Sequence, residues 1–432
     1  MKRILSFIFI FILVAAGLLG SIVWYGWDAF ETLFINRAGM AEGSEWIEQT
    51  YSTSGLNQFI GEHNDFSSLS RIEVNSADLH SSQSDLNLNQ HEPRAVGLVG
   101  SIYLMATYAE AFSTGELNPD EKIPFDDLSA WQLPSVYAQA HESLKELAQE
   151  KFPDLKIPLK TLVGWLPVAS DIALYDYLLA RLNPESIQSL FDRAQLQQTE
   201  RPVPFSGLYI TSSEWFDGTL ALFSEQDLIQ WKNKVAENPE RMKTQEFRNW
   251  IHDYAWNRAK THHSNQALSN DWRQRVKKDH LGLTFMQERD ALAFFPATST
   301  ADLVRFTEAL FQKDIVSESA QKQLKEWLGW AGIESEHNSD PGIQILQTGS
   351  IYDSRIGLLS GLHLVRFKQT ENGEEKWIFM AGVLDQLPVG LWFHLSANHM
   401  HQDYFQKLTI DTTWIAQSER MIQSIDDDST YP

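Results

Sequence analysis

Residues 97–123 of the chain read GLVGSIYLMATYAEAFSTGELNPDEKI. After Ser101, apolar side chains recur at the spacing of one helix face, at Leu104, Met105, Tyr108 and Phe112. Gly115 directly follows this pattern, and glycine readily takes the left-handed backbone conformation that ends helices. The stretch therefore predicts a helix over residues 101–114 that begins at a serine.

Strand patterns stand on both sides of a long helical middle. Two short strands are expected early, with a serine-rich turn between them at residues 81–84, and three are expected late, the last two joined by an Asn-Gly turn. The expected strands are residues 69–74, 86–89, 343–351, 357–368 and 376–384. The expected helices outside the mainly helical residues 135–300 are 46–62, 300–311, 317–330 and 391–415. This order predicts an α+β protein whose sheet joins both ends of the chain.

Two short polar motifs follow the first helix. Ser170-Asp171-Ile172 precedes an apolar helical run, and Gln347-Thr348-Gly349-Ser350 lies on an expected strand. Each motif also has a purely structural interpretation. Ser101 and the Ser170-Asp171 pair can be helix caps, and Gly349 can be a small residue where another backbone comes close.

In order and setting, these motifs resemble those of the serine β-lactamase and penicillin-binding-protein superfamily, closest to class A. That family carries S-x-x-K at a helix start, then S-D-N, then K-T-G on an inner strand. Residues 115–123 and 170–183 also look like the family's flanking segments, and the resemblance covers about residues 56–417. It implies a β-lactamase/transpeptidase-like α+β fold, in which an antiparallel sheet flanked by helices lies beside an all-helical subdomain.

The resemblance also implies a cleft and a role for each motif residue. Ser101 would be the nucleophile on the cleft floor, and Ser170 would relay a proton from one wall. The opposite wall would carry Gln347, Thr348, Gly349 and Ser350. These four residues and Asp171 would bind substrate.

Three positions depart from the family pattern. Leu104 replaces the lysine that activates the serine, Ile172 replaces an asparagine, and Gln347 replaces a lysine. A serine hydroxyl without a base is a poor nucleophile, and losing such an activating unit costs about 10⁶ in turnover, or about 8 kcal/mol of barrier. Between the motifs, Glu200 matches the deacylating glutamate of class A enzymes only in its acidity.

Two functions remain open on this sequence. The first is a catalytically impaired homologue that keeps a cleft for a peptide, a glycan or an envelope protein. The alternative is an active serine hydrolase, acting on a β-lactam or a peptidoglycan peptide through Ser101 and an unconventional base. Neither function requires a cofactor.

Composition and charge narrow the possible partners. The 432 residues carry 35 basic and 57 acidic side chains, a formal charge of −22, so nucleic-acid binding is not expected. With no cysteine in the chain, disulfides, thiolate metal sites and cysteine nucleophiles are excluded.

The first 27 residues predict a membrane anchor. Lys2 and Arg3 precede an almost unbroken apolar run over residues 4–24, which as a helix measures about 30 Å, the thickness of a hydrocarbon core. The positive-inside rule then places residues 45–417 in the periplasm of an inner-membrane, single-pass protein, or outside the cell if the run is a cleaved signal. Residues 418–432 are expected to form a flexible acidic tail.

Two further clusters have compositions that can indicate a metal site or a ligand groove. His394, His399 and His401 have a metal-like composition without a metal-binding motif, so no metal site is expected. The aromatic-rich region at about residues 215–272 predicts core or lid packing, with a glycan or peptide groove as the alternative.

Overall fold

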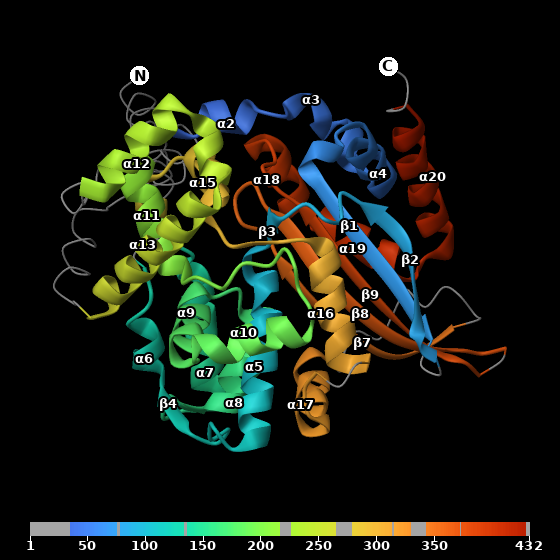
Figure 1. Cartoon of the computed structure of the whole chain (residues 1–432), viewed down its shortest axis with the longest axis horizontal. Helices are drawn as coiled ribbons and strands as arrows, with labels where there is room; N and C mark the ends of the chain where they lie inside the picture. The colour runs from blue at the N-terminus through green and yellow to red at the C-terminus, as the bar shows by residue number, and fades with distance from the viewer. Residues whose placement is uncertain are drawn as a thin grey trace, which may run out of the picture.

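The computed structural model describes residues 35–75, 78–133, 136–216, 226–264, 279–312, 315–329, 343–371 and 373–428. Its centre is a five-stranded antiparallel sheet in the order β2-β1-β9-β8-β7 (Figure 1). The strands are β1 Ser67–Asn75, β2 Asp78–Leu88, β7 Ile343–Asp353, β8 Leu359–Gln369 and β9 Glu375–Leu384. Because β1 pairs with β9, the sheet joins both ends of the chain, as predicted.

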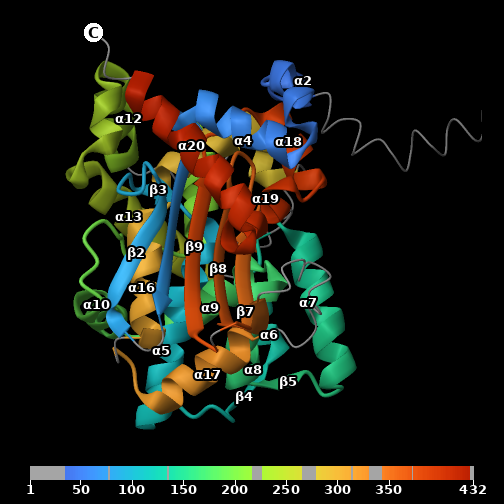
Figure 2. The ribbon, with the colours of Figure 1, turned by 90° about the vertical axis from the view of Figure 1, so that its right-hand side faces the viewer.

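Helices from the two ends of the chain cover one face of this sheet (Figure 2). Phe405 packs directly on the backbone of two neighbouring strands, since a Cβ at Gly361 or Gly382 would lie within 2.7 Å of its ring. Glycine at these positions therefore lets the helix approach the sheet closely. The covering helices are α2 Arg37–Ala41, α3 Ser44–Ile47, α4 Thr53–Glu62, α18 Val389–Ala397, α19 Met400–Ile410 and α20 Thr412–Asp428.

The opposite face carries α16 (Thr300–Gln312), with α17 (Glu318–Leu328) beside the edge strand β7. Beyond them lies the helical part of the molecule, built around the almost wholly buried helix α5 (Ser101–Thr114) (Figure 1). Its other helices are α6 Phe125–Ser129, α7 Ala138–Lys151, α8 Leu159–Ala169, α9 Ile172–Arg181, α10 Pro184–Arg193, α11 Phe205–Phe216, α12 Gln226–Glu237, α13 Gln245–Ser264 and α15 Phe285–Ala291. Two further antiparallel strand pairs are short: β3 (Arg94–Ala95) pairs with β6 (Ala297–Thr298), and β4 (Lys122–Pro124) pairs with β5 (Lys156–Pro158). The α+β prediction and the β-lactamase/transpeptidase-like arrangement are thus confirmed.

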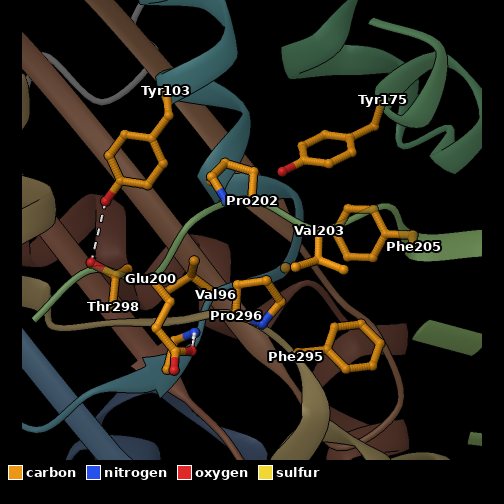
Figure 3. A pocket seen from close by; sticks show the side chains of 13 residues that line it. Val96, Tyr103, Tyr175, Glu200, Pro202, Val203, Phe205, Phe295, Pro296 and Thr298 are labelled. Atoms are coloured by element: carbon orange, nitrogen blue, oxygen red, sulfur yellow. Dashed lines mark hydrogen bonds between the residues drawn. The ribbon is translucent and has the colours of Figure 1, made fainter. Parts of the chain in front are cut away.

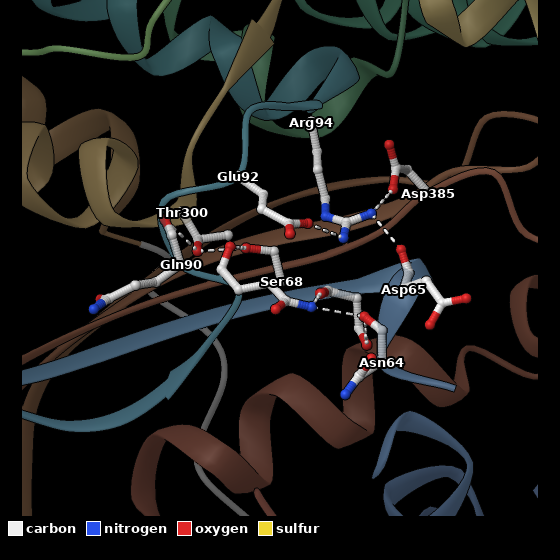
Figure 4. Close-up of polar contacts among 10 residues, drawn as sticks. Asn64, Asp65, Ser68, Gln90, Glu92, Arg94, Thr300 and Asp385 are labelled. Atoms are coloured by element: carbon white, nitrogen blue, oxygen red, sulfur yellow. Dashed lines mark hydrogen bonds and ion pairs between the residues drawn. The ribbon is translucent and has the colours of Figure 1, made fainter. Parts of the chain in front are cut away.

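A polar network ties the end of the sheet to the connection that leads into the helical part (Figure 4). Arg94 Nη1 lies 2.6 Å from Asp385 Oδ1 and 2.8 Å from the Asp65 carbonyl, while its Nη2 pairs with Glu92 at 2.7 Å. Ser68 Oγ lies 2.9 Å from Thr300 Oγ1 at the start of α16. These contacts fix how the helical part sits on the sheet.

Three local predictions were wrong. Residues 81–84 lie inside β2, where Ser82 pairs with Val74, so the backbone ladder prevails over the turn-forming tendency of serine. The helix expected over 391–415 is divided in three, because His399 takes a left-handed conformation and Asp411 caps α20 through the Trp414 N–H. The segment 46–62 is likewise broken, between α3, a 3₁₀ turn (Gln49–Tyr51) and α4.

The predicted acidic tail also differs. Residues 418–428 continue helix α20, and Ser418 Oγ reaches Asn57 Oδ1 of α4 at 2.9 Å while Ile422 is buried. Ser418 and Ile422 are therefore packed against the fold, which the run of aspartates further on does not reveal. The predicted anchor, residues 1–27, lies outside the described residues, and within the described ranges no helix has the length and apolarity to cross a membrane.

Candidate functional site

Ser101 is the first residue of α5 and is completely buried. Its Oγ has no hydrogen-bond partner among the residues that the structure describes. Gly100, rather than Ser101, occupies the N-cap position, and no side chain caps the helix there. The interpretation of Ser101 as a helix cap is therefore wrong.

The space beside the start of α5 is small (Figure 3). A cavity of about 20 Å³ lies between Gly100, Tyr175 and Phe205, and Tyr103 closes part of it through a 3.2 Å hydrogen bond with Thr298. A volume of this size holds about one water molecule. It cannot hold a β-lactam or a peptide.

A buried arginine fills the region where the sheet meets the helical part. Arg355, just after β7, is among the largest fully buried side chains, and its Nε lies 2.7 Å from Asp353 Oδ2. Its guanidinium lies 4.0 Å from the centre of the Phe205 ring and donates to Tyr209 Oη at 3.3 Å. Both aromatic residues belong to α11, which is buried over almost its whole length. Helix α11 thus occupies space in which an open cleft was expected.

The two residues of the Ser170-Asp171 motif have different surroundings. Ser170 ends α8 in a left-handed conformation with an exposed side chain. Asp171 is buried and caps α9, where its Oδ1 accepts the Ala173 N–H at 2.9 Å. The capping interpretation therefore holds for Asp171, and Ser170 points away from any shared site with its neighbour.

Asp171 also belongs to a Ser–His–Asp chain that the sequence analysis missed. His141 Nδ1 lies 2.9 Å from Asp171 Oδ2, and His141 Nε2 lies 3.0 Å from Ser129 Oγ. These distances match a catalytic relay, but Ser129 is the last residue of α6, where a helix exposes carbonyl groups rather than the N–H donors that an oxyanion needs. We therefore interpret the chain as a support for Asp171. His141 lies 30 residues from its aspartate, and no sequence spacing indicated the pair.

The motif at residues 347–350 lies on β7, and α17 covers it. Gln347 Nε2 donates to the Lys325 carbonyl at 3.3 Å, and a Cβ at Gly349 would lie only 2.3 Å from the Leu328 carbonyl oxygen. Glycine is required here by the close approach of α17. Because side chains alternate along a strand, Thr348 and Ser350 point to the other face of the sheet.

Glu200 is held in an ion pair. It pairs with Arg248 and accepts the Ala297 N–H at 2.8 Å. Although burial raises the pKa of the Glu200 carboxyl, the hydrogen bond and charge of Arg248 lower it below its usual value. A carboxylate stabilised in this way is a weak general base.

The aromatic residues of the long middle segment mostly pack in the core, as predicted. Phe247 packs edge to face with Trp215 and Trp231, and Trp215 packs edge to face with Phe294. Of the three late histidines, His401 is buried, and burial lowers its pKa to about 4. Across the described part of the chain, no cluster of His, Cys, Asp and Glu is arranged to hold a metal ion.

The sheet order, the helical part and the position of Ser101 at the start of the central helix define a serine β-lactamase/penicillin-binding-protein-like fold. No family model and no curated protein matches the chain. Solved structures that resemble it include a β-lactamase from Chitinophaga pinensis DSM 2588 (9% identity, TM-score 0.43, 83% of this chain and 99% of that one). A β-lactamase from Sphaerobacter thermophilus DSM 20745 gives 10% identity and a TM-score of 0.44 over 86% of this chain and 96% of that one.

A third structure is a mutant of PBP-A captured as an acyl-enzyme complex with penicillin G. It gives 12% identity and a TM-score of 0.41 over 87% of this chain and 96% of that one. Similarity at this level concerns the fold and does not indicate an activity. Evidence for the function comes from the residues of this chain.

Proposed function

We propose that this protein is a catalytically impaired relative of the serine β-lactamases that acts by binding a component of the cell envelope. One observation carries the proposal: the Ser101 hydroxyl is fully buried with no partner among the described residues, and Leu104, one helical turn on, is fully buried too. A nucleophilic serine needs a base within hydrogen-bond reach and room for the substrate carbonyl. In the described part of the chain, neither is present at Ser101.

The other two family positions support the same conclusion. Ile172 is buried and cannot hydrogen-bond through its side chain, and the Gln347 amide is already bonded to the α17 backbone. The polar groups that would hold a substrate amide and carboxylate are therefore replaced or occupied. The alternative, an active hydrolase with an unconventional base, would require the buried Ser101 hydroxyl to become accessible to a substrate and to a base.

Covalent labelling tests the proposal. The detergent-solubilised full chain is incubated with a penicillin and with a fluorophosphonate, and its intact mass is measured beside the Ser101→Ala variant and an active class A enzyme. We expect no adduct under conditions that label the active enzyme. An adduct that disappears in Ser101→Ala would establish an activated serine and refute catalytic impairment.

We further propose that the protein is anchored in the inner membrane with its folded part in the periplasm. The support lies in the sequence, where Lys2 and Arg3 precede an apolar run over residues 4–24. Alkaline extraction of membranes should leave the full chain in the pellet and release a chain that begins at residue 28. Protease added to spheroplasts should digest the folded part, and protection of that part would contradict the orientation.

A further inference from the structure

An open groove of about 1130 Å³ lies on the helical part; Ser101 does not line it, although Glu200, Pro202 and Val203 line both this groove and the small cavity beside the start of α5. One wall is a face of α13, where lining residues recur every three or four positions, at Gln245, Asn249, Asp253, Trp256 and Lys260, with Asn257 next to Trp256. The other wall is α10 with the segment 197–203. From position 245 to position 260 the α13 wall measures about 22 Å, so the groove suits an extended chain rather than a single small molecule.

The second wall is fixed before any ligand arrives. Asp302 Oδ2 accepts the backbone N–H groups of Gln197 and Gln198 at 2.9 and 2.6 Å, and the Glu200 N–H donates to the Ala297 carbonyl at 2.9 Å. A preorganised wall reduces the entropy that a ligand must lose on binding. These bonds also leave no run of free N–H groups with which a peptide backbone could pair.

The groove carries no net charge. Its lining contains two carboxylates, Glu200 and Asp253, and two cations, Arg201 and Lys260. Burial lowers the pKa of His252, which also lines the groove, to about 4, so this histidine is neutral at pH 7. On a chain with a formal charge of −22, a neutral groove offers little attraction to an anionic polymer.

Side-chain amides are the commonest polar groups of the lining. There are six, and those of Gln197, Gln198 and Asn257 are exposed without a hydrogen bond to any described part of the protein. An amide both donates and accepts, which suits a ligand rich in hydroxyl groups. The half-buried Trp256 adds an apolar surface to the same wall.

We infer that this groove binds an uncharged oligosaccharide chain. Sugar rings present hydroxyl groups at their edges and C–H groups on their faces, which match free amides and an indole respectively. This inference rests on the proposed binding function and names a site and a ligand class for it.

Calorimetric titration of the detergent-solubilised full chain tests the inference, with β-1,4-linked tetrasaccharides of glucose and of N-acetylglucosamine as probes. Asn257→Ala and Gln198→Ala remove one free amide from each wall. Gln417→Ala is the matched control, because this exposed amide lies on α20, outside the groove. We expect at least one tetrasaccharide to bind, each groove variant to weaken binding about three- to tenfold, and the control to bind unchanged.

Tetra-alanine and an anionic oligosaccharide are titrated as comparison ligands. Three results would overturn the inference: no heat with either tetrasaccharide, equal binding by the groove variants and the control, or tighter binding of a comparison ligand than of the tetrasaccharides. None of them depends on the chemistry at Ser101. Absent sugar binding together with absent fluorophosphonate labelling would therefore reject the groove and leave the impaired serine standing.

Discussion

Arg355 and Asp353 form an ion pair in the interior of the protein, with Nε and Oδ2 2.7 Å apart. The same carboxylate oxygen accepts the Leu98 N–H at 2.7 Å. Leu98 belongs to the 3₁₀ turn Gly97–Gly100 that leads directly into Ser101. The edge strand, the buried arginine and the turn that precedes α5 are thus joined by one carboxylate.

Replacing the arginine should therefore destabilise the whole fold. In Arg355→Met the buried Asp353 carboxylate loses its counter-ion, and breaking a buried pair in this way costs about 3–5 kcal/mol of unfolding free energy. The matched control is Lys160→Met, which breaks the exposed pair with Asp120 and should cost less than about 1 kcal/mol. Urea denaturation measures both, and equal losses would show that the buried pair does not hold the fold.

Gly97 should tolerate no side chain. A Cβ there would lie 1.8 Å from Asp353 Oδ2, and its φ is +55°. Gly115 provides the control, since its φ is +76° but no atom of the described residues lies within 4 Å of the Cβ position. We expect Gly115→Ala to cost about 1–2 kcal/mol for the left-handed conformation alone, and Gly97→Ala to cost clearly more. Similar midpoints for the two variants in urea would contradict the tight contact.

Ser101→Ala should not destabilise the protein. It removes a buried hydroxyl that has no partner among the described residues, so the free energy of unfolding should stay unchanged or rise by about 1 kcal/mol. Ser317→Ala is the contrasting variant, because Ser317 Oγ does cap α17 through the Ala320 N–H and its loss should cost about 1 kcal/mol. Thermal unfolding separates the two, and a loss at Ser101 similar to that at Ser317 would show a hydrogen bond to the Ser101 hydroxyl.

Local patterns predicted most of the framework. The apolar spacing after Ser101 and the glycine at 115 gave α5 its observed bounds, and alternation gave β7, β8 and β9 to within three residues at each end. Such elements are encoded within the segment that forms them. The prediction that one sheet joins both ends of the chain is confirmed by the pairing of β1 with β9.

The candidate site could be predicted less well from the sequence, because the burial of its residues depends on contacts between distant segments. That α11 covers Arg355 and that α17 covers Gly349 are tertiary facts with no local signature. The motif at 347–350 looks the same in sequence whether a helix covers it or a cleft opens beside it. In the sequence, the catalytic impairment that we propose is indicated by Leu104, Ile172 and Gln347, which replace a lysine, an asparagine and a lysine of the family pattern.

The protein should lose stability in mild acid because of a buried histidine. Burial lowers the pKa of His363 to about 3, with a smaller effect from His401. In the unfolded chain a histidine has a pKa of about 6.5, so between these values the unfolded state binds the proton and the folded state does not. The stability that depends on neutral His363 is therefore fully present above about pH 6.5 and is lost as the pH falls towards 3.

Between pH 7 and pH 4.5 this single group should lower the free energy of unfolding by about 2–3 kcal/mol. His363→Leu places an apolar side chain beside Tyr352 and removes the group that binds the proton. Between pH 7 and pH 4.5, the unfolding free energy of this variant should therefore fall by about 2–3 kcal/mol less than that of the parent chain. The exposed His91 provides the control, and His91→Leu should retain the dependence of the parent chain. Urea denaturation at the two pH values measures all three chains, and an unchanged difference in His363→Leu would place the acid sensitivity at other groups.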